Sequence, residues 1–310
     1  MLGIIDSLAL KDLVVDYLRH SVICKKGPTV ERVLFQTIRD TVNSQAKAMD
    51  FLRELANGAQ QYAALFNPEH ATWNHYGETT RGHIRTILEL QVEQIRSLMF
   101  AVLQHFDVEE AKKAFRLFVA WSVRFLISGG GRGGLLDRHY GLRAQEVTAG
   151  TITTAKQLVK AMADVVPPDG TFQTAFAEAR VSQAHLARYY LRALERQAKG
   201  DPEPEHIPNQ EEVVNLEHVL PQTPSDGWTI DPDMAEAYYK RLGNMVLLKA
   251  KKNVAIGNKP FNEKRPELQA SGYILTKQVG DEEAWGVSQI AKRQKRLADL
   301  AVKTWPIGVP

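Results

Sequence analysis

Apolar residues in the first two-thirds of the chain recur at spacings of three and four, a pattern that predicts amphipathic helices. The clearest cases span residues 80–106 and 108–127, and Asp107 is expected to cap the second. The same periodicity predicts four more helices, over residues 4–19, 30–56, 154–165 and 182–198. No stretch before residue 200 predicts a strand. Residues 1–200 are therefore expected to form an α-helical domain.

The pattern changes after a proline-rich, charged stretch, "KGDPEPEHIP" at residues 199–208, which indicates a linker or a long surface turn. Short apolar runs beyond it predict two strands and two helices, with an element that is either helix or compact loop. The strands are expected at 213–219 and 244–248, the helices at 233–242 and 289–305, and the open element at 249–258. Residues 201–310 are thus expected to form a small α+β domain, and the whole chain to be mainly α.

Composition limits the function classes. The chain has 310 residues, 44% hydrophobic and 24% charged, which is typical of a globular protein of two ordinary domains. Its one cysteine, Cys24, excludes an internal disulfide and a Cys-rich zinc site. Neither a signal segment nor a run of about 20 apolar residues is found, so we expect a cytoplasmic protein without a membrane partner. The net charge of +3 permits a nucleic-acid partner without requiring one.

Polar residues follow the expected strands. Glu217 and His218 stand side by side at the end of an apolar run, and burying such groups is costly unless they are paired or bind a metal. Asn244 opens the second strand, and Asn253 and Asn258 follow it. Three simpler interpretations stay open: an ordinary strand-end histidine, a turn asparagine, and a solvated face for the basic run between residues 240 and 265. The near-copy "EHIP" at residues 205–208 has no apolar strand before it and is interpreted as structural.

This order of strand, loop, strand and helix resembles the ββα-metal (His-Me finger, HNH) nuclease motif. A closer resemblance is to the C-terminal HNH domain of GmrSD-type modification-dependent restriction endonucleases. It rests on the blocks "EHVLPQ", "LGNMVLL" and "KNVAIGNKPFNEK", and on Trp285, Ile290, Arg293, Leu297, Ala298, Ala301 and Trp305. Those proteins usually begin with a ParB-like NTPase domain. Residues 1–30 show no nucleotide-binding motif, so NTP hydrolysis is not expected, and we interpret the chain as a fragment or as the nuclease partner of a split system.

The resemblance implies a metal-dependent DNA endonuclease that acts in defence against foreign or modified DNA. His218 suits the general base because its unperturbed pKa lies near working pH. By resemblance, Asn244 orients the His218 ring, and Glu217 and Asn253 hold one divalent cation, with Asn258 as the alternative to Asn253. Oxygen ligands of this kind suit Mg²⁺ or Mn²⁺.

The basic run supplies the expected contacts to a nucleic-acid backbone, namely Lys251, Lys252, Lys259 and Lys264. The expected partners are DNA, a ParB-like NTPase domain or subunit, and a second copy of the chain, since two nuclease centres help to cut both strands. Two other functions stay open: a catalytically idle DNA- or partner-binding subunit that needs an NTPase partner, and an RNase.

Overall fold

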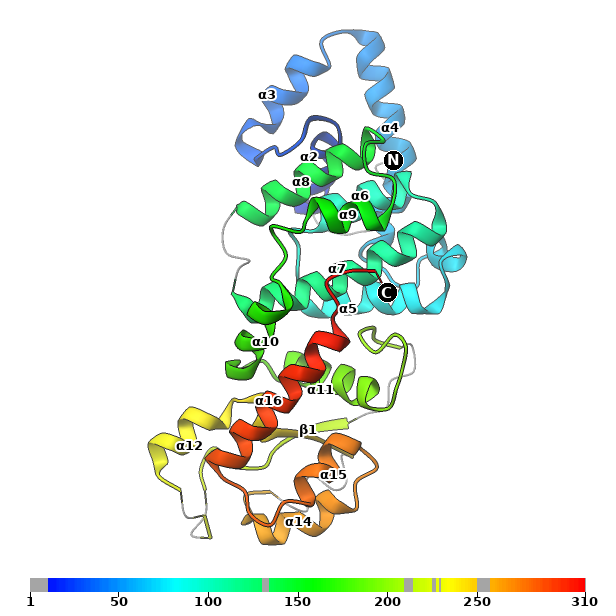
Figure 1. The fold of residues 1–310 in the computed structure, drawn as a ribbon. Coiled ribbons are helices and arrows are strands. Elements are labelled where there is room, and N and C mark those ends of the chain that lie inside the picture. The colour runs from blue at the N-terminus through cyan, green and yellow to red at the C-terminus, as the bar shows by residue number, and fades with distance from the viewer. Residues whose placement is uncertain are drawn as a thin grey trace. The chain divides into compact units, whose positions relative to one another are not determined.

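The structure, a computed structural model, describes residues 11–129, 134–208, 214–224, 227–228, 230–249 and 257–309. These residues are mainly helical, and the sheet among them has two antiparallel strands (Figure 1). This confirms the expected fold class, a mainly α chain with a small α+β part. Contacts divide the chain into two compact units, Met1–Val166 with Ile307–Pro310, and Pro167–Pro306. Within the described residues, no helix has both the length and the apolar character that a membrane crossing requires.

The first unit is a helical bundle. Its elements are α2 (Lys11–Lys26), α3 (Glu31–Thr41), α4 (Gln45–Ala64), η1 (Ala71–His75), α5 (Gly77–Leu90), α6 (Arg96–His105), α7 (Val108–Ser128), α8 (Leu135–Thr148) and α9 (Ala155–Ala161). Helix α7 supplies much of the core, because Phe115, Phe118 and Trp121 are all fully buried. Asp107 caps α7 as expected, since its carboxylate accepts from the Glu110 amide at 2.9 Å.

Two expected long helices are each broken in the structure. The helix over 80–106 is replaced by α5 and α6, because Gln91 adopts a left-handed conformation with φ of 54° and ends α5. The helix over 30–56 is replaced by α3 and α4, and Ser44 caps the second by accepting from the Lys47 amide. Helices α8 and α10 were not expected from the sequence. Of the helix expected over 4–19, residues 1–10 lie outside the described part.

The second unit combines helices with the sheet. Its elements are α10 (Asp169–Glu178), α11 (Ala184–Ala198), β1 (Val214–His218), α12 (Pro232–Tyr239), η2 (Leu242–Asn244), β2 (Met245–Lys249), α14 (Phe261–Gln269), α15 (Ile274–Gly280) and α16 (Val287–Thr304). The sequence suggests a boundary near residue 200. The structure groups α10 and α11 with this unit instead, because both pack against α16 and α11 also packs against the two strands.

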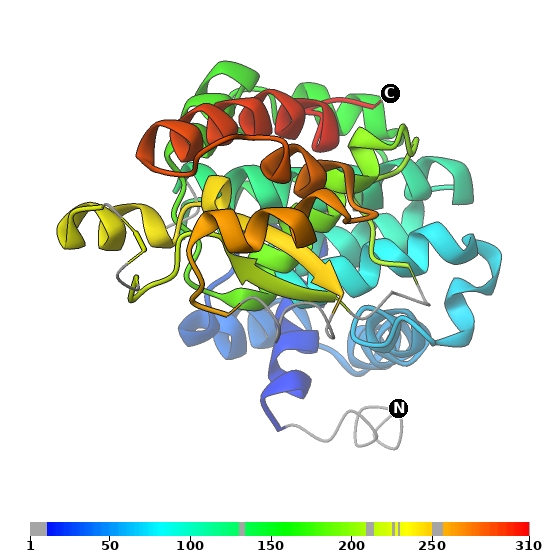
Figure 2. The ribbon, with the colours of Figure 1, turned by 90° about the horizontal axis from the view of Figure 1, so that it is seen from below.

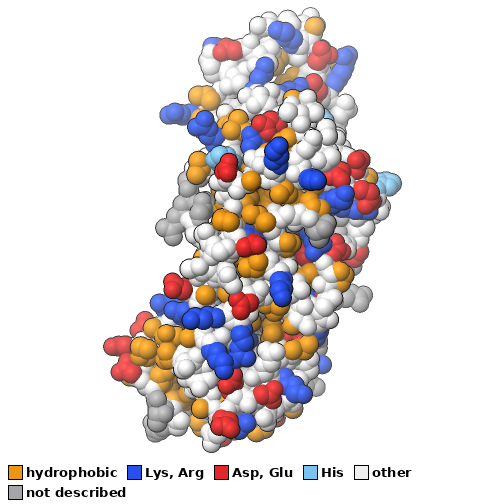
Figure 3. Space-filling model, in the orientation of Figure 1, with side chains coloured by type: hydrophobic (Ala, Val, Ile, Leu, Met, Phe, Trp, Pro, Cys, Tyr) orange, Lys and Arg blue, Asp and Glu red, His pale blue; other side chains and the backbone are white. Residues whose placement is uncertain are grey.

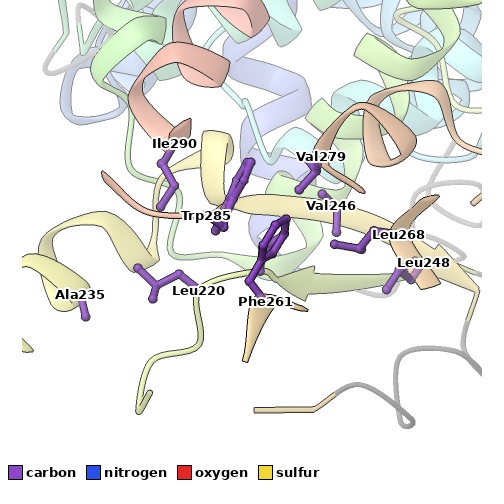
Figure 4. Packing of buried hydrophobic residues seen from close by; sticks show 10 residues of the cluster. Leu220, Ala235, Val246, Leu248, Phe261, Leu268, Val279, Trp285 and Ile290 are labelled. Carbon is purple, nitrogen blue, oxygen red and sulfur yellow. The ribbon is translucent and has the colours of Figure 1, made fainter. Parts of the chain in front are cut away.

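The two strands lie side by side in opposite directions (Figure 2), with Leu216 opposite Leu247. Val246 and Leu248 of β2 pack into an apolar cluster with residues of the helices that follow. Figure 4 shows Phe261 at the start of α14 lying against Trp285, and their rings stack with centroids 5.8 Å apart. One face of the sheet is therefore closed by the segment after β2, so the end of β1 lies beside α14.

Candidate active site

Glu217 and His218 occupy the last two positions of β1, where they pair with Val246 and Met245 of β2. Successive side chains of a strand point to opposite faces. Glu217 therefore lies on the face of Val246, which packs toward α14, and His218 lies on the other. Adjacent positions at a strand end thus place a carboxylate and an imidazole on either side of the same backbone.

Glu217 is paired with a buried lysine of α14. The Lys264 ammonium lies 2.6 Å from Oε1 of Glu217 and also donates to the His218 carbonyl at 3.1 Å. The Lys264 side chain is fully buried, whereas 11% of the Glu217 side chain remains exposed. Burial raises the pKa of Glu217 and the Lys264 charge opposes that rise; burial likewise lowers the pKa of Lys264. The pair is thus a largely buried internal salt bridge.

His218 is held neutral at physiological pH. Burial, and then the nearby Lys264 charge, lower the pKa of His218 to about 4. The ring stacks on Tyr239 at the end of α12, with centroids 4.1 Å apart and planes 19° from parallel. A neutral imidazole has a free lone pair, so it can accept a proton from a bound water, but a pKa of about 4 makes it a weaker base than its unperturbed pKa implies. The stack fixes the plane of the ring.

Asn244 braces the segments on both sides of His218. Asn244 is fully buried, and its side chain binds backbone groups and the Trp285 indole rather than the His218 ring. Oδ1 accepts from the Leu220 amide at 2.8 Å and from the Trp285 indole at 3.1 Å. Nδ2 donates to the carbonyls of Leu220 and Tyr239 at 2.8 and 3.2 Å. Asn244 therefore positions the chain after His218 and the residue on which the His218 ring stacks.

Side chains of helix α16 form hydrogen bonds with the backbone of η2. Nη1 of Arg293 donates to the carbonyls of Leu242, Gly243 and Met245, at 2.8–3.0 Å. The Gly243 amide donates to the Gln294 side chain. A Cβ on Gly243 would come within 2.4 Å of the Ile290 carbonyl, so only glycine permits this approach. The motif residues of the C-terminal tail thus hold Asn244 in place.

The remaining predicted site residues have different outcomes. Asn253, Lys251 and Lys252 lie outside the described residues. Asn258 and Lys259 are exposed, just before α14. The prediction that Lys264 contacts a nucleic-acid backbone does not agree with its position, because its side chain has no exposed surface and is paired with Glu217. Asn244 makes no hydrogen bond to the His218 ring in the structure, and its influence on that ring is indirect.

The near-copy of the motif has a structural role. Nδ1 of His206 donates to the Glu203 carbonyl at 2.7 Å, and the His206 carbonyl accepts from Arg196. The Glu205 carbonyl accepts from the Tyr189 hydroxyl at 2.8 Å. These contacts fix the turn after α11, as expected for a pair without a preceding strand.

The donor chemistry around Glu217 suits a hard cation only in part. A carboxylate is a ligand that Mg²⁺ and Mn²⁺ accept, and the Glu217 side chain is 11% exposed. Across the described ranges, however, no three His, Cys, Asp or Glu side chains are grouped so that they could hold a metal ion. Much of the Glu217 charge is already balanced by Lys264. A cation here would need further oxygen donors from outside this pair.

Charges of both signs are mixed on the surface. On the face drawn in Figure 3, Lys and Arg side chains are interspersed with Asp and Glu rather than gathered into one basic surface. Lys259 is exposed beside the site, and its carbonyl accepts from the Trp228 indole at 3.3 Å. A backbone contact near the site would therefore be local, made by a few cations close to β1 and α14.

Comparison with known proteins agrees with this geometry. The family model of "GmrSD restriction endonucleases, C-terminal domain" matches residues 166–300, which span α10 to most of α16. This part of the chain therefore belongs to that family, and a helical region precedes it. Membership implies a nuclease of a restriction system that acts on DNA. A search of curated proteins finds no match to the chain.

Proposed function

We propose that this protein is a metal-dependent DNA endonuclease of the HNH type, with His218 as its general base. The observation that carries the proposal is a neutral, stacked imidazole beside a partly open carboxylate, within a restriction-endonuclease domain. His218 accepts the proton of the attacking water, and Tyr239 and Asn244 keep its ring in position. Lys259 contacts the DNA backbone, together with Lys251 and Lys252.

Glu217 holds one Mg²⁺ or Mn²⁺ ion together with Asn253, or with Asn258 in its place. When bound, the ion acts as a Lewis acid that stabilises the charge developing on the phosphate. Glu217 would hold the ion on one side of the β1 backbone, and His218 would accept the proton of the water on the other. The supporting observation is the opposite direction of the two side chains at the end of β1.

The test is conversion of supercoiled plasmid to open-circle or linear DNA with Mg²⁺ or Mn²⁺, with EDTA as the metal-free control. His218→Ala should abolish conversion, because no base remains. His206→Ala is the matched control, since it removes the histidine of the near-copy and should leave cleavage intact. Metal-dependent cleavage that survives in His218→Ala would refute the assignment of the base. Plasmids with and without modified bases, and matched RNA, would define the substrate.

A second candidate function is a DNA-binding subunit that cuts only with an NTPase partner. The Glu217–Lys264 salt bridge favours this function, because a carboxylate whose negative charge is neutralised by a lysine attracts a metal cation weakly. Salt-sensitive DNA binding without cleavage, and cleavage once a ParB-like NTPase is added, would support this function over the first.

A further inference from the structure

The second unit contains a cavity of about 270 Å³ that is lined by residues of α11, α15, α16 and the segment between α15 and α16. Its apolar wall is formed by Leu275, Trp285, Leu297 and Leu300. Ligand sites in proteins combine such apolar walls with a small number of polar groups that fix the orientation of the ligand. The polar groups of this cavity therefore decide what it can bind.

Arg293 of α16 lines the cavity and has donors without partners. Nη1 donates to the carbonyls of Leu242, Gly243 and Met245, whereas Nε and Nη2 have no hydrogen-bond partner within the described residues. Arg293 is only 6% exposed. Buried donors are nearly always paired, so two unpaired donors on one side chain indicate a missing acceptor.

The two unpaired nitrogens favour an anionic acceptor. Nε and Nη2 form one edge of the planar guanidinium, and their parallel N–H groups match two oxygens of a phosphate or a carboxylate. Burial lowers the pKa of Arg293 to about 9, so the group is still charged at neutral pH. The carboxylate of Glu195 on α11 favours that charge, but it is itself bound to the amides of Ile274 and Leu275.

The other charges that line the cavity leave a positive balance. Glu282 is paired with Arg296 at 3.1 Å, and Asp299 accepts from the Gln173 amide at 2.6 Å. Lys303 is exposed and forms no ion pair within the described part of the chain. With Arg293, the lining thus has three cations and two carboxylates, and both carboxylates already have partners.

We propose that this cavity binds a small organic anion, whose phosphate or carboxylate group is held by Nε and Nη2 of Arg293. Its volume exceeds that of one such group, and the apolar wall accommodates a hydrophobic body. The DNA backbone does not fit, because Arg293 is buried and the carboxylates of Glu282 and Asp299 repel a polyanion. Since Nη1 of the same guanidinium binds the backbone around Asn244, the anion also stabilises that segment.

The test is isothermal titration calorimetry of the full chain in EDTA with phenyl phosphate and benzoate, and with phenol as the uncharged control. At least one anion should bind with a Kd below about 1 mM, and phenol should not. The tighter of the two anions identifies the preferred group. Binding is measured without cleavage, so the result is independent of the nuclease assignment.

Variants locate the binding. Lys303→Glu should weaken the better anion at least about tenfold, because it reverses a charge at the cavity. Lys295→Glu is the matched control, since Lys295 is exposed on the same helix but does not line the cavity, and it should change affinity less than about twofold. Arg293→Lys keeps a positive charge without the two parallel donors and should abolish binding. Where Arg293→Lys fails to fold, Lys303→Glu still decides the outcome.

Three results would overturn the proposal. One is the absence of binding by both anions, or binding of phenol as tight as that of the anions. Another is equal affinity in wild type and Lys303→Glu, which would place the anion elsewhere. The third is displacement of the anion by a short DNA duplex, which would assign the cavity to the DNA backbone.

Discussion

Replacing Asn244 with alanine tests how far the site depends on one buried amide. The side chain satisfies four groups: the amide and carbonyl of Leu220, the Tyr239 carbonyl and the Trp285 indole. Each buried group left without a partner costs about 1–3 kcal/mol. Water entering the space can satisfy some of them, so we expect Asn244→Ala to lower the free energy of unfolding of the second unit by about 3–5 kcal/mol. That is a large share of the roughly 5–15 kcal/mol typical of a domain.

The assay is equilibrium urea unfolding of the full chain, followed by tryptophan fluorescence and circular dichroism. Trp228, Trp285 and Trp305 report on the second unit, and the signal of Trp73 and Trp121 in the first unit is removed by replacing both with phenylalanine in every variant compared. The matched control is Asn43→Ala, because Asn43 is exposed and this change should shift stability by less than about 0.5 kcal/mol. A loss below about 1 kcal/mol in Asn244→Ala would show that the four bonds do not stabilise the unit, and would refute the reasoning.

Three further predictions concern other buried groups. His20 is buried against the Tyr62 hydroxyl, and burial lowers its pKa from 6.5 to about 3. The stabilising contribution of neutral His20 is therefore complete above pH 6.5 and is lost as the pH falls below that value. The free energy of unfolding of the first unit should fall by about 1.4 kcal/mol between pH 7.5 and 5.5. Urea titrations at the two pH values would measure this loss, which should be absent in His20→Gln. Lys264→Met should lower the free energy of unfolding by about 3–5 kcal/mol, because it leaves the Glu217 charge without a partner. The double variant Glu217→Gln/Lys264→Met should lose less stability than the sum of the losses in the two single variants. Additive losses in a double-mutant cycle would contradict this. Gly243→Ala should lower the unfolding temperature measured by calorimetry by several degrees, because the new Cβ would clash with the Ile290 carbonyl. Gly272→Ala is the control, because the space around Gly272 is open and its unfolding temperature should not change.

The sequence predicts well those elements whose signals are local. Asp107 marks the start of α7, and the apolar runs locate both ends of both strands to within one residue. The break at Gln91 was missed because glutamine has no preference for the left-handed conformation that it adopts there. Helix α14 was missed because residues 261–269 are mostly polar, and their anchors, Phe261, Lys264 and Leu268, are few.

Some residues of the candidate site were likewise predicted from the sequence, whereas their long-range contacts were not. Glu217, His218 and Asn244 were found from their place at strand ends, and family resemblance assigned their roles. The Lys264–Glu217 bond joins residues 47 positions apart, so no local pattern could indicate it. The stacking of Tyr239 on His218 likewise depends on how α12 returns to the strand. A lysine near a predicted metal ligand is as readily assigned to the surface as to the interior, and only its burial decides between them.

The support of η2 by α16 has a consequence for biosynthesis. Arg293 donates to the carbonyls of Leu242, Gly243 and Met245, and it is synthesised about 50 residues after them. While the ribosome is still synthesising α16, these carbonyls and the Asn244 brace have no support. The second unit therefore acquires these three hydrogen bonds only after residue 293 has emerged, and a product that stops before residue 293 would lack them.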